Sequence, residues 1–356
     1  MTRREFIGSA ALSAGSLFTG CAGFGPAVSK NEGGGFIWAD LVHLGMNFWG
    51  DMPRHDWTGW QNVENETIRQ AIKDEYCAAD HVRFDENLWR DVAPAFRAAG
   101  TNMIVLDLGE AVEYPSHPEI AVKGAWSAEK LRAEIARLRS MGFEVIPKLN
   151  FSATHDTWLG EYHRMVSTRK YYEVVADLIH DVAELFDRPR FLHLGLDEEI
   201  AEYQRWTSYL VKRQGDLWWH DLNFYVKETE RWGMRPWIWS DYERRHPEEF
   251  YSRMPRSVVQ SPWDYRGPVD PAKNPLTKIY LDLDKAGFDV IVCASNCYRT
   301  KDNFVDTVEF CRRNLSSRHY IGAIMAPWLE MNEVFRARHL EAASQIAEAR
   351  KRGGGI

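Results

Sequence analysis

The chain lacks an excess of positive charge. Its 356 residues include 51 acidic and 44 basic side chains, which gives a formal net charge of −7 at pH 7. Such a chain offers no extended basic field that would attract the phosphate backbone of a nucleic acid. We therefore expect no nucleic-acid partner.

Metal-binding spacings are also missing. The sequence contains no His-x-His pair and no His-Glu-x-x-His motif of the kind that holds catalytic zinc. A zinc-dependent hydrolase is an alternative that these absences weigh against. We expect no metal and no other cofactor.

Cysteine is scarce, with five residues in the chain, and one of them, Cys21, lies near the N-terminus. The other four lack a second Cys or His pair at zinc spacing. A domain of this size does not need disulfides for stability. We expect buried free thiols, with a disulfide after export as the alternative, at Cys77, Cys293, Cys297 and Cys311.

The N-terminal segment is typical of a twin-arginine export signal. Arg3 and Arg4 precede Phe6, and a stretch of small and apolar residues follows from Ser9 to Phe18. This stretch is too short and too rich in Gly, Ala and Ser to stay in a membrane as a span. We expect residues 1–27 to be a signal peptide, and the protein to be exported to the periplasm or cell envelope.

Cys21 ends a stretch that is similar to a bacterial lipobox, Leu17-Phe18-Thr19-Gly20-Cys21. Acylation of Cys21 would anchor the protein to a membrane surface. Simple cleavage near Ala22 is the alternative. A lipid on Cys21 is therefore the only membrane contact that we expect.

The rest of the chain has the composition of one domain. Residues 28–35 are polar and rich in glycine, which predicts a flexible tether over residues 28–40. No second linker of this kind and no repeat of solenoid period follows. Residues 41–356 are long enough for a single catalytic α/β barrel, which needs about 250 residues.

Short apolar runs alternate with amphipathic stretches along this domain. We expect strands at residues 42–48, 102–108, 143–150, 190–197, 234–240, 257–262, 289–295 and 320–327. We expect helices at residues 86–99, 128–141, 170–186, 217–232, 302–313 and 333–351. This alternation predicts a (β/α)8 TIM barrel of the α/β class, with a doubly wound open sheet as the alternative.

The apolar run of the predicted strand at residues 190–197 leads directly into the adjacent acids Asp197, Glu198 and Glu199. Catalytic groups of α/β barrels lie where strands end, and two carboxyl groups in different surroundings can together split a glycosidic bond. The alternative is that the acids only open the next helix. Neighbours in a regular strand point to opposite faces, so Asp197 and Glu198 converge only if the strand ends or twists between them.

Acidic and aromatic residues recur after the other predicted strands. A sugar ring has an apolar face and a belt of hydroxyl groups, so a sugar site needs flat aromatic walls edged by carboxylates and amides. We expect Trp239 and Trp328 to form such walls. The tryptophans in predicted helices are expected to be packing residues: Trp89, Trp206, Trp218, Trp219 and Trp232.

From about residue 102 to residue 330 the chain resembles the family-20 glycoside hydrolases, the β-N-acetylhexosaminidases. The signature His-x-Gly-Gly-Asp-Glu of that family stands here as His193-Leu194-Gly195-Leu196-Asp197-Glu198, with only the second glycine replaced. Further matches in order and spacing are the stretch from Arg139 to Pro147, Trp239-Ser240-Asp241, Tyr298 with Asp302, and Trp328-Leu329-Glu330.

The resemblance implies roles for the catalytic residues. Glu198 would protonate the leaving oxygen, and Asp197 would orient the acetamido group of the substrate for attack on the anomeric carbon. His155, after the third strand, would be the partner of Glu198, and Glu110, after the second strand, would hold His155. The alternation of side chains along a strand, and not the resemblance, predicts that Glu199 is an expendable acid at a helix start.

The resemblance also implies a rim that binds the sugar. Tyr298 would hydrogen-bond the acetamido oxygen, and Glu330 would bind ring hydroxyls. The full set of substrate-binding residues that we expect is Trp239, Asp241, Tyr298, Trp328, Glu330, Glu110 and Asn47.

Besides the replaced glycine, the chain departs from the family elsewhere. The first strand lacks an arginine that would clamp a terminal sugar, Lys148 replaces a glutamate, and Glu110 stands where the family has an aspartate. We expect an exported retaining glycosidase that removes β-linked N-acetylhexosamine from a glycan by substrate-assisted catalysis. The alternatives are a similar barrel that acts on a non-acetamido glycoside, and a non-catalytic envelope lipoprotein that binds glycans.

Overall fold

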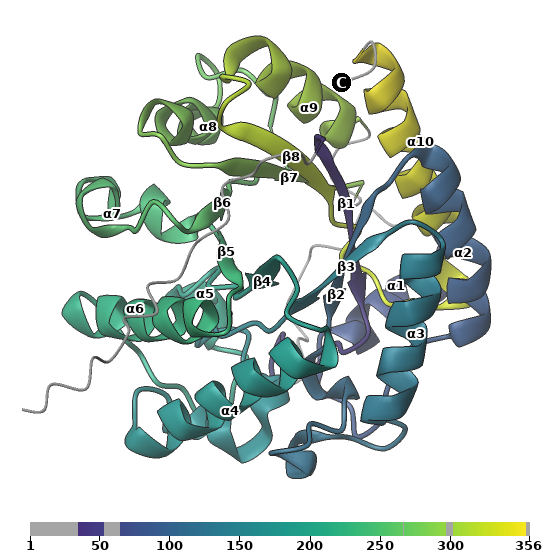
Figure 1. Cartoon of the computed structure of the whole chain (residues 1–356), viewed down its shortest axis with the longest axis vertical. Helices are drawn as coiled ribbons and strands as arrows, with labels where there is room; N and C mark the ends of the chain where they lie inside the picture. Colours follow the sequence, from purple (N-terminus) through teal and green to yellow (C-terminus); the bar gives the residue numbers. More distant parts are fainter. Residues whose placement is uncertain (1–34, 53–64, 266, 297–301, 354–356) are drawn as a thin grey trace, which may run out of the picture.

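The computed structural model describes residues 35–52, 65–265, 267–296 and 302–353. In this part of the chain, eight parallel strands pair in sequential order and close into a barrel, and the helices lie around its outside (Figure 1). This confirms the predicted TIM barrel and excludes the open sheet. The strands are β1 (Ile37–His43), β2 (Met103–Asp107), β3 (Glu144–Lys148), β4 (Phe191–His193), β5 (Arg235–Trp239), β6 (Val259–Ser261), β7 (Val290–Ala294) and β8 (Tyr320–Met325).

The helices include all six that the sequence predicts, with ends that differ by a few residues. They are α1 (Glu66–Glu75), α2 (Glu86–Ala99), α3 (Ala128–Ser140), α4 (Arg169–Leu185), α5 (Ala201–Gln204), α6 (Asp216–Arg231), α7 (Pro247–Arg253), α8 (Pro275–Lys285), α9 (Asn303–Asn314) and α10 (Arg336–Arg352). Short 3-10 turns are η1 (Gly109–Ala111), η2 (Pro118–Ile120), η3 (Thr157–Met165), η4 (Asp241–Arg244) and η5 (Glu333–Phe335).

Helix α2 shows how the sequence sets the helix ends. The side chain of Asp85 caps its start by accepting hydrogen bonds from the backbone N–H groups of Asn87 and Leu88. Gly100 ends it with a φ of 92°, in the left-handed region where glycine is favoured. Helices α3 and α6 end two residues before Gly142 and Gly233, which also have positive φ.

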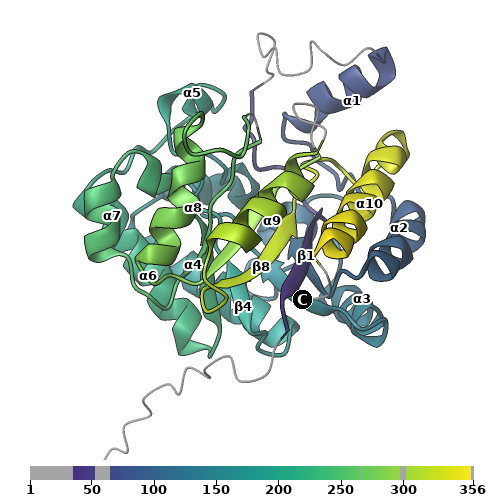
Figure 2. The same cartoon turned by 90° about the horizontal axis from the view of Figure 1, so that it is seen from above.

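Apolar residues pack in two shells. The inner shell fills the barrel with side chains such as Leu41, Val105 and Phe191, and the larger outer shell lies between the strands and the helices. Helices α1 and α5, which follow β1 and β4, lie at one end of the barrel (Figure 2). This is the end at which the strands finish, and it is where the candidate site lies.

The first strand lies earlier than predicted. Strand β1 starts at Ile37, which is paired with Gly322 of β8, so residues 37–40 of the predicted tether belong to the barrel. The predicted strand at 42–48 was placed too late because the apolar pattern continues past His43. Leu44, Met46 and Phe48 are buried, but they pack in the loop after the strand. The segment predicted as a signal peptide lies outside the described residues.

The cysteines that the structure describes are free. Cys293 and Cys311 are buried and Cys77 is half-buried, while Cys21 and Cys297 lie outside the described residues. Among the residues described, no helix combines the length and the apolar character that a membrane crossing requires.

Candidate active site

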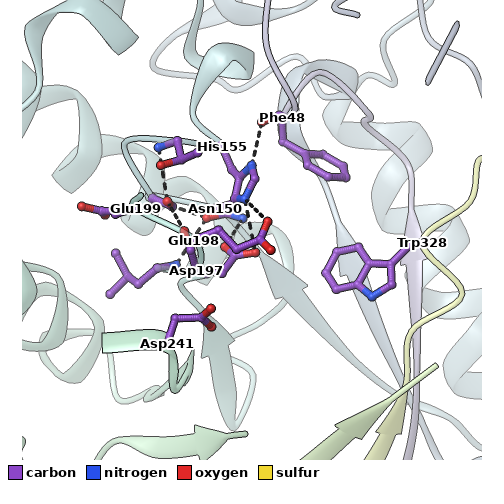
Figure 3. A network of polar contacts seen from close by, with 12 residues as sticks. Phe48, Asn150, His155, Asp197, Glu198, Glu199, Asp241 and Trp328 are labelled. Carbon is purple, nitrogen blue, oxygen red and sulfur yellow. Dashed lines mark hydrogen bonds and ion pairs between the residues drawn. The ribbon is translucent and has the colours of Figure 1, made fainter. Parts of the chain in front are cut away.

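The backbone turns sharply after β4 and brings Asp197 and Glu198 to the same side. The strand ends at His193, and the next residues include three with φ in the left-handed region: Gly195 at 71°, Leu196 at 69° and Glu198 at 51°. Non-glycine residues rarely adopt this conformation, which costs free energy and clusters at functional sites. The side chains of Asp197 and Glu198 are 9% and 13% exposed and point toward His155 (Figure 3).

His155 links the two carboxyl groups. Its Nε2 atom lies 3.3 Å from Oε2 of Glu198 and 3.6 Å from Oδ2 of Asp197. Its Nδ1 atom lies 3.2 Å from the carbonyl oxygen of Phe48. A carbonyl can only accept, so Nδ1 carries a hydrogen. Nε2 is then the ring nitrogen that faces both carboxyl groups.

Asn150, in the loop after β3, fixes the position of Asp197. Its Nδ2 atom donates a hydrogen bond of 2.9 Å to Oδ1 of Asp197. Its Oδ1 atom accepts from the backbone N–H groups of Ser152 at 3.0 Å and Leu196 at 3.3 Å. Burial raises the pKa of Asp197, and the positive charges of His155 and Lys148 oppose that rise. The Asn150 amide thus binds the loops after β3 and β4 to each other.

Replacing Gly195 by alanine should damage this arrangement. A Cβ atom on Gly195 would lie 2.0 Å from Oδ1 of Asn150, so the Asn150 side chain would have to leave Asp197. We expect activity to fall by about tenfold or more, in addition to the ~1–2 kcal/mol that a left-handed alanine costs. The control is Gly233→Ala, which has a similar φ but open space at Cβ and should cost stability only. Equal activities of the two variants would contradict the role given to Asn150.

Glu199 is not the expendable acid at a helix start that the sequence suggests. Its Oε1 atom lies 2.5 Å from Nη2 of Arg213 and accepts from the backbone N–H of Ala153. The Arg213 guanidinium is fully buried and also contacts Oδ2 of Asp221 at 2.9 Å and the carbonyl oxygen of Phe151 at 2.7 Å. This network holds the loop that carries His155 against the segment that carries Glu198.

A cavity of about 690 Å³ opens beside these acids, lined by Glu198 and Asp241 among others. Asp241 follows β5, and its Oδ2 atom accepts a hydrogen bond of 2.8 Å from Nε1 of Trp263. Burial raises the pKa of Asp241 to about 6, while the charge of Arg244 opposes the rise. Trp206, Trp218 and Trp263 also contribute to the lining. Trp206 and Trp218 are buried, as their predicted packing roles require, and a part of each also faces the cavity.

Four polar residues form a layer below the acids. His43, Asp107, Lys148 and His193 are the last residues of β1 to β4, and each is paired in register with the next. Asp107 Oδ2 lies 2.5 Å from Lys148 Nζ and 3.0 Å from His43 Nδ1. Burial alone would raise the pKa of Asp107, but the charge of Lys148 and the hydrogen bond with His43 lower it. In the sequence Lys148 stands out only as a departure from the family pattern, because all four of these residues lie before the predicted strand ends.

Glu110 and Asn47 both contact backbone groups of the neighbouring loops. The Glu110 carboxylate accepts hydrogen bonds from the backbone N–H groups of Met46 and Asn47, and it is Phe48 that contacts His155. The Asn47 side chain exchanges two hydrogen bonds with the backbone of Ala79. Both residues are buried and shape the loop after β1, so their polar atoms are already used.

The remaining residues predicted to bind the sugar differ in how exposed their side chains are. Trp239 is 1% exposed, with its ring centroid 4.3 Å from that of His193, so it is a floor residue and not a sugar wall. Trp328 is half-buried, has a φ of 55°, and lies opposite the acids in Figure 3. Glu330 is buried and forms an ion pair of 2.9 Å with Arg83. Tyr298 lies outside the described residues.

Asp156, beside His155, should make stability depend on pH. Its Oδ2 atom is buried with no hydrogen-bond partner among the described residues, and burial raises its pKa from 3.8 to about 8. Between these values the folded protein holds a proton that the unfolded chain has released. Stability should therefore fall as pH rises from about 4 to about 8, by up to ~1.4 kcal/mol per pH unit.

The variant Asp156→Asn should remove this dependence. In denaturant unfolding at a series of pH values, we expect the free energy of unfolding of the variant to rise relative to that of the wild type as pH rises. Asp187→Asn, at an exposed position, is the control and should leave the pH dependence unchanged. Parallel curves for the wild type and Asp156→Asn would contradict the raised pKa.

Asp197, Glu198 and His155 also lie close enough together to bind a cation. One ligand atom from each of His155, Asp197 and Glu198 lies within 4.8 Å of the others. One imidazole and two carboxylates suit several divalent metals. The same atoms also contact one another at the distances given above, so their positions do not by themselves require an ion.

Comparisons with known proteins bear on the fold. No known family profile matches the chain, and no curated protein sequence matches it. Solved structures do match. A β-N-acetylhexosaminidase is 12% identical over 88% of this chain and 71% of its own, with a TM-score of 0.60.

Two further solved structures have TM-scores of 0.52. A GH20 exo-β-N-acetylglucosaminidase from Vibrio harveyi, in complex with N-acetylglucosamine, is 13% identical over 89% of this chain. A β-N-acetylhexosaminidase from Bacteroides fragilis is 14% identical over 87% of this chain. The chain spans only 57% and 65% of the lengths of these two proteins. At such identities the likeness shows a shared barrel fold.

Proposed function

We propose that this chain is an exported retaining glycoside hydrolase that removes β-linked N-acetylhexosamine from glycans, with the acetamido group of the substrate as nucleophile. The observation that carries the proposal is the convergence of Asp197 and Glu198 on His155 at the end of β4, beside an open cavity. The shared fold with structures titled as β-N-acetylhexosaminidases supports it.

Glu198 is the proton donor in this proposal. It lines the cavity, and its partner His155 is fully buried and fixed by the carbonyl oxygen of Phe48. As the bond from the anomeric carbon to the leaving oxygen breaks, that oxygen takes the proton from Glu198. In the second step the Glu198 carboxylate removes a proton from the attacking water.

Asp197 acts on the acetamido group. Its carboxyl accepts a hydrogen bond from the acetamido N–H, which aims the carbonyl oxygen at the anomeric carbon and stabilises the positive charge of the cyclic oxazolinium that forms. Water then opens this ring at the anomeric carbon and restores the acetamido group. Asn150 holds Asp197 in place during both steps.

Hydrolysis of chromogenic β-glycosides tests the proposal. The panel contains matched pairs of sugars with a 2-acetamido or a 2-hydroxyl group, each assayed with and without a chelator. We expect turnover of the acetamido member only, unaffected by the chelator. Turnover of the 2-hydroxyl member would favour a different glycosidase mechanism, and a chelator-sensitive rate would favour a cation at His155. Binding of glycans without turnover of any substrate would favour a binding protein.

A further inference from the structure

Tyr265 lies between two aromatic side chains of the site. It is in the segment after β6, and its side chain is buried. Its ring is stacked on that of Trp263, with the ring centroids 4.9 Å apart and the planes at 24°. Its hydroxyl accepts a hydrogen bond of 3.0 Å from Nε1 of Trp328. Trp263 lines the cavity beside Glu198, and Trp328 lies opposite the acids (Figure 3), so one side chain connects these two aromatic residues.

The barrel wall holds Tyr265 in place. Trp263 forms a parallel bridge with Cys293 of β7, and the backbone N–H of Cys293 donates a hydrogen bond of 3.0 Å to the carbonyl oxygen of Pro262. The hydroxyl of Tyr265 also lies 3.2 Å from Sγ of Cys293. The segment after β6 and strand β7 therefore set the position of this hydroxyl, and the loop that carries Trp328 does not.

The backbone of Trp328 does not favour its position by itself. Strand β8 ends at Met325, and Trp328 has a φ of 55°, in the left-handed region that is unfavourable for a bulky side chain. Such a conformation persists only where surrounding contacts hold it, and it clusters at functional sites. The contacts on the side chain therefore decide where the indole lies.

The hydrogen bond to Tyr265 is the directional contact among these. The centroid of the Trp328 ring lies 5.4 Å from that of His43 and 5.8 Å from that of Trp239, with tilted planes in both cases. Apolar packing of this kind is non-directional, whereas a hydrogen bond weakens steeply when its angle changes. The bond from Nε1 thus selects one orientation of the indole plane. That orientation matters for a sugar, because a sugar ring packs its apolar face on a flat aromatic wall.

We propose that Tyr265 is a positioning residue that fixes the plane of the Trp328 indole as the wall of the sugar site opposite Asp197 and Glu198. The inference rests on the proposed function, because it concerns the wall against which the same sugar would pack. Tyr265 is buried and acts through Trp328, so it does not need to touch the sugar.

The variant Tyr265→Phe removes the hydroxyl and keeps the ring that stacks on Trp263. A readout that needs no substrate is hydrogen exchange of the indole N–H of Trp328, followed by NMR of the full chain and assigned by its loss in Trp328→Phe. Loss of the acceptor should speed this exchange by about fivefold or more. The matched control is Tyr251→Phe, which removes a hydroxyl on α7 that donates to Glu243 and should leave the exchange rate unchanged.

Sugar binding tests the consequence for the site. Calorimetric titrations use the full chain carrying Glu198→Gln, with N-acetylglucosamine and N-acetylgalactosamine as probes. We expect the dissociation constant of the sugar that binds to rise by about threefold to tenfold in Tyr265→Phe and to stay unchanged in Tyr251→Phe. In the Trp328→Phe background, which lacks the indole N–H, Tyr265→Phe should have no further effect, because the two residues act through one hydrogen bond.

The outcomes separate this inference from the proposed function. An unchanged exchange rate of the Trp328 N–H in Tyr265→Phe, or losses of affinity that add up in the double variant with Trp328→Phe, would overturn the positioning role even if the enzyme cleaves N-acetylhexosaminides. Equal losses of affinity in Tyr265→Phe and Tyr251→Phe, or no binding of either sugar, would also overturn it. Faster exchange and weaker sugar binding in a chain that hydrolyses no glycoside would retain the positioning role and reject the glycosidase.

Discussion

Glu198→Gln is expected to lower kcat on an N-acetylhexosaminide by about 10²- to 10⁴-fold, the usual contribution of a positioned general acid or base. Glutamine keeps the size of the side chain but can neither give a proton to the leaving oxygen nor remove one from water. The amide of glutamine can keep the 3.3 Å contact that the Glu198 carboxyl makes with His155, so the fold should tolerate the change. The measurement is kcat and KM on a chromogenic substrate, with the thermal midpoint as a check of folding.

The leaving group sharpens this test. A substrate with an acidic phenol as leaving group needs little protonation, so the loss in Glu198→Gln should be smallest with it and should grow with leaving-group pKa. Asp197→Asn should show a loss that does not depend on the leaving group in this way, because Asp197 acts on the acetamido group. A Glu198→Gln enzyme with nearly full activity on every substrate would remove Glu198 from the mechanism.

Arg213→Met should cost about 3–5 kcal/mol of folding free energy, which is typical of breaking a buried ion pair by removing one partner. The substitution leaves the Glu199 and Asp221 carboxylates without their shared cation, and the carbonyl oxygen of Phe151 without its donor. It also frees the loop that carries His155, so activity should fall along with stability. The measurement is the free energy of unfolding in urea together with kcat.

The comparison that makes this prediction specific is Arg169→Met. Arg169 forms an ion pair with Glu173 on α4, but its side chain is 94% exposed, and such pairs contribute ~0–1 kcal/mol. Arg213→Lys keeps the charge without the fork of donors, so it should fold and show an intermediate loss. If Arg213→Met and Arg169→Met lose the same stability, the buried network does not have the importance assigned to it.

The barrel could be predicted because its signals are local and repeated. Amphipathic spacing, an aspartate cap before α2 and glycines after α2, α3 and α6 each mark an element without reference to its neighbours. Strand β1 was misplaced because the apolar residues run on past His43 into the loop. Burial alone does not distinguish a strand from a buried loop, and pairing with β8 settled the position.

The site could be predicted where it depends on one segment and not where it depends on several. The Asp197–Glu198 pair lies in one segment and stands out in the sequence, and the resemblance to a family pointed to its contact with His155 from another segment. The roles of Glu110, Asn47 and Glu199 depend on which backbone groups face them from other loops, and spacing along the chain does not contain that information. The exposure of Trp239 and Trp263 likewise follows only from the packing around them.

The central claim is that the acetamido group of the substrate attacks the anomeric carbon with the help of Asp197. It is tested most directly by kcat/KM for chromogenic N-acetylhexosaminides whose acetyl methyl group carries zero, one, two or three fluorine atoms. Fluorine weakens the carbonyl oxygen as a nucleophile, so we expect the rate constant to fall steadily, by about tenfold or more across the series. A rate constant that stays the same across the series would contradict the account, because a nucleophile supplied by the protein or by water would not respond to the fluorine atoms.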